Sequence, residues 1–135
     1  MSASHHSVEN KRPLSPHLSV YNPQITSVLS ISHRLTGLAL YLGAALLAVW
    51  IMLTVYGCAD CVNPLIFSPF GLVIIGAWSF AFYYHMLNGI RHLFWDIGKG
   101  YEISTVTKSG IAVVIGAVAL TAGTWACILM NGGAS

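Results

Sequence analysis

Three long apolar runs, separated by short polar segments, dominate the pattern of the chain. The runs, none of which contains Asp, Glu, Lys or Arg, cover residues 35–56, 62–90 and 109–130. Crossing a membrane takes roughly 20 mostly apolar helical residues, and continuous runs argue against barrel strands, which alternate. We therefore predict three transmembrane helices, over about 27–56, 68–96 and 108–130.

The segments before the first helix are polar. Residues 1–11 are expected to form a flexible tail. Residues 12–26 contain three prolines, which prevent a regular helix and favour an extended arm on the cytoplasmic side. Thr26 or Ser27 could cap the first helix. The whole chain, 1–135, is expected to be a single membrane-anchor domain.

Turn residues mark the remaining helix ends. Pro69 suits the first turn of the second helix, and Gly98 and Gly100 should end that helix. The polar stretch 104–108 is expected to lead into the third helix without belonging to it.

Composition supports a membrane protein. The chain is 56% hydrophobic and 7% charged, with a mean hydropathy of +0.71, whereas soluble domains have about 25% charged residues. A net charge of +2 is too small to indicate nucleic-acid binding. The expected class is an all-α membrane protein surrounded by lipid, with no nucleic-acid partner.

The distribution of basic residues predicts the orientation. All six lie before the first apolar run or between the second and third: Lys11, Arg12, Arg34, Arg91, Lys99 and Lys108. Because positive residues favour the cytoplasmic side, the N-terminus should be cytoplasmic and the C-terminus periplasmic. The polar N-terminus resembles neither a secretory signal nor a presequence, which favours a bacterial inner membrane over a mitochondrial one.

A histidine within the second apolar run is the first candidate for chemistry. On a helix, His85, Gly89, His92 and Asp96 share one face. An intramembrane ionisable side chain usually faces a bundle interior or a cofactor. Imidazole is a common axial ligand of haem iron, and Gly89 would let a flat cofactor approach. The alternative, a packing histidine bonded to a neighbouring helix, stays open, and the stripe alone favours haem only modestly.

A second candidate lies at the start of the first helix. Ser27, Ser30 and Arg34 share a face at spacings of three and four residues. A hydroxyl beside a guanidinium can donate hydrogen bonds to a quinone carbonyl. On sequence alone, an ordinary helix start with an interfacial arginine remains the favoured interpretation.

Two further features are interpreted as structural. Cys58 and Cys61 could form a strained disulfide or half of a metal site. No second Cys/His pair lies nearby to complete a zinc site, so free or loosely paired thiols are expected. Trp95 follows Arg91 by four residues, a spacing that allows a cation–π contact.

Three segments together resemble a known family. Residues 12–18 read Arg-Pro-Leu-Ser-Pro-His-Leu, residues 30–37 read Ser-x-x-His-Arg-x-x-Gly, and residues 85–96 read His-x-x-x-Gly-x-Arg-His-Leu-x-x-Asp. They are similar to the cytochrome b membrane-anchor subunits of succinate dehydrogenase (complex II), especially the mitochondrial and alphaproteobacterial branch. The resemblance implies that the three helices form half of a haem-binding bundle, completed by a second anchor subunit.

The resemblance implies a role for four residues at a haem b. His85 matches the residue that supplies one axial ligand to the haem iron, while the second anchor subunit supplies the other. His33, His92 and Arg34 match positions near the haem propionates.

The resemblance also implies a ubiquinone site. Ser30 and Arg34 match its serine and arginine, Asp96 matches an acidic residue close to it, and Ser27 is a weaker candidate.

The implied function is that of the anchor of succinate:ubiquinone oxidoreductase, in the respiratory chain and the tricarboxylic acid cycle. A flavoprotein and an iron–sulfur subunit would oxidise succinate, since this chain has neither a dinucleotide fingerprint nor a cluster-type cysteine set. The chain would contribute the quinone site. The alternatives are a fumarate reductase anchor and a haem-free structural anchor. A transporter subunit is disfavoured because the polar residues gather on one side of the membrane.

Overall fold

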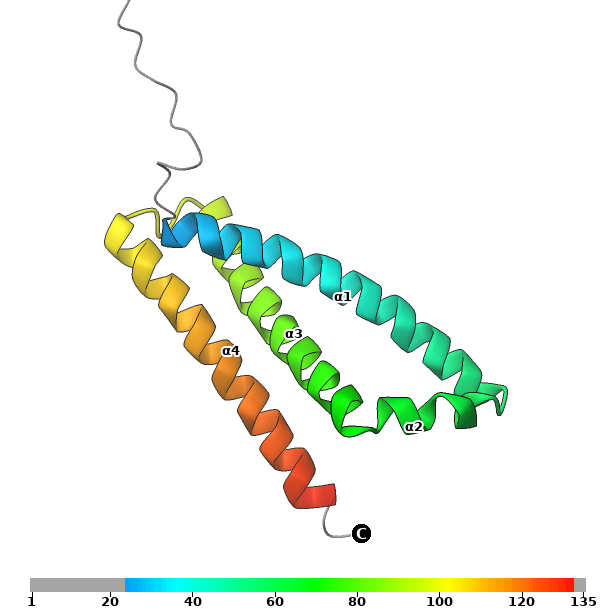
Figure 1. Cartoon of the computed structure of the whole chain (residues 1–135). Helices are drawn as coiled ribbons and strands as arrows, with labels where there is room; N and C mark the ends of the chain where they lie inside the picture. Colours follow the sequence, from blue (N-terminus) through cyan, green and yellow to red (C-terminus); the bar gives the residue numbers. More distant parts are fainter. Residues whose placement is uncertain (1–23, 133–135) are drawn as a thin grey trace, which may run out of the picture.

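The computed structural model describes residues 24–132, which are almost entirely helical (Figure 1). The elements are α1 (Ile25–Val55), the 3-10 turn η1 (Ala59–Cys61), α2 (Asn63–Ile66), α3 (Pro69–Asp96) and α4 (Ile103–Gly132). The three long helices are each long and apolar enough to cross a membrane, and the described residues contain no strand. The expected all-α class with three transmembrane helices is confirmed.

The first helix starts without a side-chain cap. Gln24 is its N-cap residue, and the Gln24 carbonyl accepts the N–H groups of Ser27 at 3.0 Å and Val28 at 3.1 Å. The expectation that Thr26 or Ser27 caps the helix was therefore wrong, because both lie inside its first turn. The expected arm accordingly ends before residue 25; its remainder, and the expected tail, lie outside the described residues.

The second long helix begins and ends at the turn residues identified above. Ser68 caps α3, its Oγ accepting the Gly71 N–H at 3.1 Å, and Pro69 is the first helical residue. After Asp96 the backbone enters the left-handed region, with φ of 76° at Gly98 and 86° at Gly100. Glycine adopts this conformation without the steric penalty that a Cβ brings.

The third long helix begins earlier than predicted. Its first residue is Ile103, not residue 108, and the Val106 N–H already donates to the Glu102 carbonyl at 2.8 Å. Residues 104–108 are mostly polar, and for this reason they were predicted to lie outside the helix. Their polarity fits a position near the membrane surface, and it does not prevent them from being helical. The apolar run therefore indicated the membrane-embedded part of α4 and missed its first turn.

The three long helices converge at one end. There α1 begins, α3 ends and α4 begins, whereas at the opposite end the helices diverge and η1 and α2 connect α1 to α3 (Figure 1). The convergent end contains every Lys and Arg of the described residues, and we call it the basic end: Arg34, Arg91, Lys99 and Lys108.

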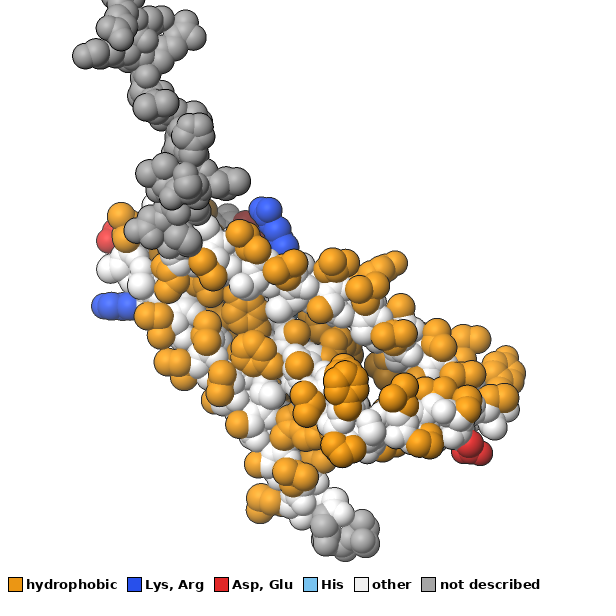
Figure 2. All heavy atoms as spheres, viewed as in Figure 1, with side chains coloured by type: hydrophobic (Ala, Val, Ile, Leu, Met, Phe, Trp, Pro, Cys, Tyr) orange, Lys and Arg blue, Asp and Glu red, His pale blue; other side chains and the backbone are white. Residues whose placement is uncertain are grey.

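The buried core is small. It consists of Leu29, Tyr84, Val113 and Ala117, and the Tyr84 hydroxyl donates to the Leu29 carbonyl at 3.1 Å. Leu29 is the single buried residue of α1, and apolar side chains cover much of the visible surface (Figure 2). A surface this apolar requires contact with lipid or with other membrane helices.

Candidate functional site

The ring of His85 projects from α3 toward α1. Its Nδ1 lies 3.0 Å from the His33 carbonyl oxygen and 3.3 Å from Thr36 Oγ1. Because a carbonyl oxygen can only accept a hydrogen bond, Nδ1 is the protonated nitrogen of the neutral ring. The lone pair is then on Nε2, the nitrogen available to a metal.

The residue of α1 that faces the His85 ring is Gly37, which has no side chain. A Cβ placed on Gly37 would lie 2.9 Å from His85 Cε1, closer than real Cβ contacts allow. One residue earlier, Thr36 Oγ1 donates within its own helix, to the carbonyl of Ser32 at 2.8 Å or that of His33 at 2.9 Å. A lone pair of the hydroxyl therefore remains to accept the proton of His85 Nδ1.

Three histidines gather between α1 and α3. The ring of His33 stacks on that of His85, with centroids 4.0 Å apart and an interplanar angle of 9°, and the centroid of His92 is 5.0 Å from that of His33. Nδ1 of His33 is buried and has no hydrogen-bond partner in the described part of the chain. Buried polar atoms are normally satisfied, so this nitrogen is open to a bound group.

Ser27 and Ser30, which were predicted to bind a quinone, line a cavity at the basic end. It has a volume of about 330 Å³, and its wall combines three residues of α1 with three of α3: Thr26, Ser27, Ser30, Arg91, His92 and Trp95. Neither Arg34 nor Asp96 belongs to this wall, and both side chains are exposed in the chain as described. The structure thus unites two of the four predicted quinone residues and leaves the other two on the outer surface.

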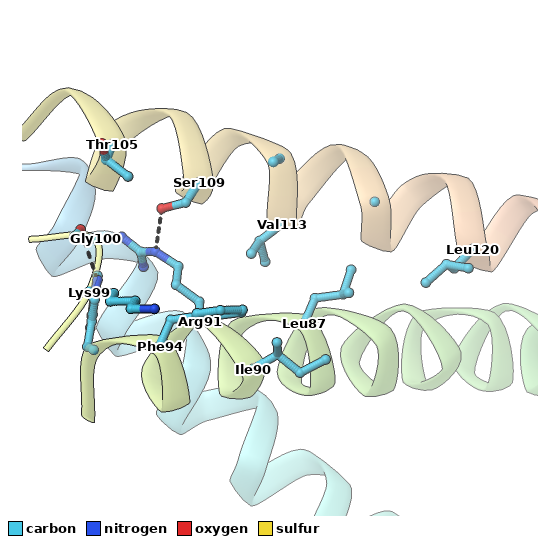
Figure 3. A pocket seen from close by; sticks show the side chains of 13 residues that line it. Leu87, Ile90, Arg91, Phe94, Lys99, Gly100, Thr105, Ser109, Val113 and Leu120 are labelled. Carbon is cyan, nitrogen blue, oxygen red and sulfur yellow. Dashed lines mark hydrogen bonds between the residues drawn. The ribbon is translucent and has the colours of Figure 1, made fainter. Parts of the chain in front are cut away.

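Arg91 occupies a more central position than its sequence context indicated. It is only 6% exposed. Its guanidinium donates to Ser109 Oγ at 3.0 Å (Figure 3), Asn88 Oδ1 at 3.3 Å and the Val106 carbonyl at 3.1 Å. These acceptors are neutral, so the positive charge is buried and shared between α3 and α4.

The predicted cation–π contact is confirmed. Arg91 Cζ lies 4.1 Å from the centroid of the Trp95 ring. The spacing of the two residues within one helix was therefore sufficient to predict this contact. The hydrogen bonds of Arg91 to Ser109 and Val106 depend on how α4 packs against α3, so the sequence did not predict them.

The donor set fits a haem better than a chelated ion. Within residues 24–132 no three His, Cys, Asp or Glu side chains are grouped to hold a metal ion. Cys58 and Cys61 are free cysteines in the described part of the chain. A haem iron is held by one or two axial side chains, of which histidine is a common one. An Nδ1-protonated His85, over a glycine and beside a histidine with an unsatisfied nitrogen, fits one side of such a site.

Comparison with known proteins settles the family. The family model described as succinate dehydrogenase/fumarate reductase transmembrane subunit matches residues 8–124. The chain belongs to this family. The resemblance identified from the three sequence segments is thereby confirmed, and the chain is a multi-pass membrane subunit of the succinate dehydrogenase type.

Individual relatives agree with this assignment. The succinate dehydrogenase cytochrome b556 subunit of Rickettsia conorii is 42% identical over 130 residues, which cover 93% of this chain and 99% of the relative. That of Paracoccus denitrificans is 41% identical over 111 residues, 81% of this chain and 85% of the relative. The mitochondrial cytochrome b560 subunit of Mus musculus is 38% identical over 122 residues, 84% of this chain and 70% of the relative.

Proposed function

We propose that this chain is the haem-bearing membrane anchor of a succinate:ubiquinone oxidoreductase. It would hold a flavoprotein subunit, an iron–sulfur subunit and a second anchor subunit at a bacterial inner membrane, with its N-terminus cytoplasmic and its C-terminus periplasmic. The observation that carries the proposal is the hydrogen bond from His85 Nδ1 to the His33 carbonyl, which leaves Nε2 for the iron. The names of the relatives favour succinate oxidation over fumarate reduction.

In this proposal His85 holds a haem b from one side. A haem bound there would store one electron beside the quinone cavity. His33 and His92, with Arg34, would receive the propionates. The second axial ligand would come from the second anchor subunit, because the His33 ring lies flat against that of His85 and does not face its Nε2.

The serine-lined cavity would hold the ubiquinone head group. The hydroxyls of Ser27 and Ser30 can donate hydrogen bonds to a quinone oxygen. The buried charge of Arg91 favours negative charge developing on that oxygen, because few water molecules screen it there. Arg34 and Asp96 would complete the site from the surface that partner subunits cover.

A pair of histidine variants tests the haem assignment. In the purified complex, His85→Leu should abolish the haem band of the reduced-minus-oxidised absorption spectrum, because the axial ligand is lost. His92→Leu would remove a contact to a propionate and leave the axial ligand in place, so the band should be retained. An unchanged spectrum in His85→Leu would exclude His85 as the ligand.

A serine variant tests the quinone cavity. Ser30→Ala should slow ubiquinone reduction about five- to tenfold, the effect expected of one hydrogen bond, while succinate oxidation by an artificial acceptor stays unchanged. Ser79→Ala is the control, since Ser79 Oγ donates within α3 to the Ile75 carbonyl. Equal quinone rates in the two variants would exclude Ser30 from the site.

A further inference from the structure

A second hollow lies between α3 and α4, on the side of Arg91 that faces α4. Its volume is about 430 Å³, and most of its wall is apolar, including Leu87, Ile90, Val113 and Leu120 (Figure 3). Ser27 and Ser30, which line the proposed quinone cavity, are absent from this wall. We call it the α3–α4 groove.

The polar residues of the α3–α4 groove gather at one end. Lys99, Thr105 and Ser109 lie at the basic end, and Leu120 lies at the other (Figure 3). The side chain of Lys99 is exposed. The nearby carboxylates Asp96 and Glu102 are not part of the wall, so the charge that the groove presents is positive.

The apolar part of the groove is about as long as one leaflet is thick. Along α4 the wall extends about 22 Å from Thr105 to Leu120, at 1.5 Å per residue, and about 16 Å of this lies in the apolar run that begins at Ser109. The hydrocarbon layer is about 30 Å thick, so one leaflet contributes about 15 Å. A transmembrane helix of a partner would need a groove that continues through both leaflets.

We propose that the α3–α4 groove binds one anionic phospholipid of the leaflet at the basic end. One of its two acyl chains would lie along the apolar wall, and the phosphate would meet the ammonium group of Lys99. Basic pockets between transmembrane helices favour anionic head groups in this way. Arg91 is less suited to this role because its guanidinium already donates to Ser109, Asn88 and Val106. The inference depends on neither the haem nor the quinone assignment.

Two groove variants test the site in the intact, purified complex. The complex is placed in detergent micelles containing phosphatidylglycerol or phosphatidylcholine, and bound lipid is counted by native mass spectrometry. Ala112→Phe fills the groove from an exposed wall position. Ala119→Phe, exposed on the same helix but outside the wall, is the control. The wild type and the control should retain one more phosphatidylglycerol than Ala112→Phe.

Two lysine variants test the head group. Lys99→Gln should weaken phosphatidylglycerol binding about fivefold, the effect of one basic side chain at a membrane surface. It should weaken phosphatidylcholine binding less, because the choline group of that lipid already balances the charge of its phosphate. Lys108→Gln is the control, because Lys108 is exposed on α4 and is not part of the wall.

Several results would overturn the proposal. Equal phosphatidylglycerol retention in Ala112→Phe and Ala119→Phe would exclude the groove. Equal binding of the two lipids by the wild type would exclude recognition of an anionic head group. Loss of a partner subunit from Ala112→Phe would assign the groove to a protein contact, and loss of bound quinone would assign it to the quinone tail.

Discussion

The tautomer of His85 follows from two oxygen atoms of α1, the His33 carbonyl and Thr36 Oγ1, both close to Nδ1. An imidazole whose second nitrogen donates a hydrogen bond is more electron-rich toward a metal. Thr36 would therefore influence the proposed haem through His85.

Replacing Thr36 by valine should raise the midpoint potential of the haem. The change removes one acceptor from Nδ1–H, so the imidazole donates less electron density and the oxidised iron is less stabilised. We expect a rise of roughly 20–60 mV, the one-electron equivalent of about 1 kcal/mol, measured by redox titration of the purified complex.

Two threonine variants control for this effect. Thr36→Ser keeps the hydroxyl and should keep the potential. Thr54→Val should also leave it unchanged, because Thr54 Oγ1 donates only within its own helix, to Trp50. A potential that is the same in Thr36→Val and in the wild type would show that the His33 carbonyl alone governs the ring.

The sequence predicted the positions of some site residues but not the contacts of others. The stripe of His85, Gly89 and His92 followed from helical spacing, because all three lie on one helix. Thr36 carried no such signal, since a mid-helix threonine usually bonds back to its own backbone. Its contact with His85 joins residues on separate helices and becomes visible only when α1 packs against α3.

At the scale of elements, a glycine sets the approach of α4 to α1. A Cβ on Gly110 would overlap Leu29 Cδ1, and Leu29 is the residue that α1 buries in the core. Small residues allow such close helix contacts in membranes.

Gly110→Ala should destabilise the complex by about 1–3 kcal/mol, the usual cost of overpacking, seen as a lower thermal inactivation temperature. Combining it with Leu29→Ala should restore part of the loss, because the leucine that the new methyl group meets is gone. Gly123→Ala is the control, since a Cβ there meets nothing within 4 Å. Equal stability of the Gly110 and Gly123 variants would contradict the close contact.

Sequence patterning predicted the long helices and both ends of α3, but not the cap of α1 or the start of α4. Apolar runs report the depth of a segment in the membrane, so they identified three spans. The start of α4 at Ile103 and the uncapped start of α1 after Gln24 depend on backbone hydrogen bonds, which polar and apolar residues form equally well.

At the scale of the whole molecule, the chain is an incomplete bundle. Its core is limited to the region where the three helices meet, and large apolar side chains such as Leu46, Leu129 and Met130 are 70–78% exposed. The proposed haem would lie at the edge of such a bundle, with its second face against another subunit.

The purified chain alone should therefore fail to form a haem with two axial ligands from protein. Produced together with the second anchor subunit, it should show the sharp reduced-state bands of a six-coordinate low-spin haem. The measurement is the absorption spectrum of each preparation, with haem supplied to both. A six-coordinate spectrum from the chain alone would mean that it provides both ligands itself.

The length of α1 determines how close the proposed quinone cavity would lie to the membrane surface. The helix contains 31 residues, about 46 Å at 1.5 Å per residue, whereas its apolar run starts only at Leu35. The first turns of α1 would therefore rise out of the hydrocarbon into the head-group layer, and they bring Ser27 and Ser30 with them. The cavity then lies at the boundary between two phases. The proposed ubiquinone would then arrive sideways from the bilayer, and the protons for its reduction would come from the adjacent aqueous side.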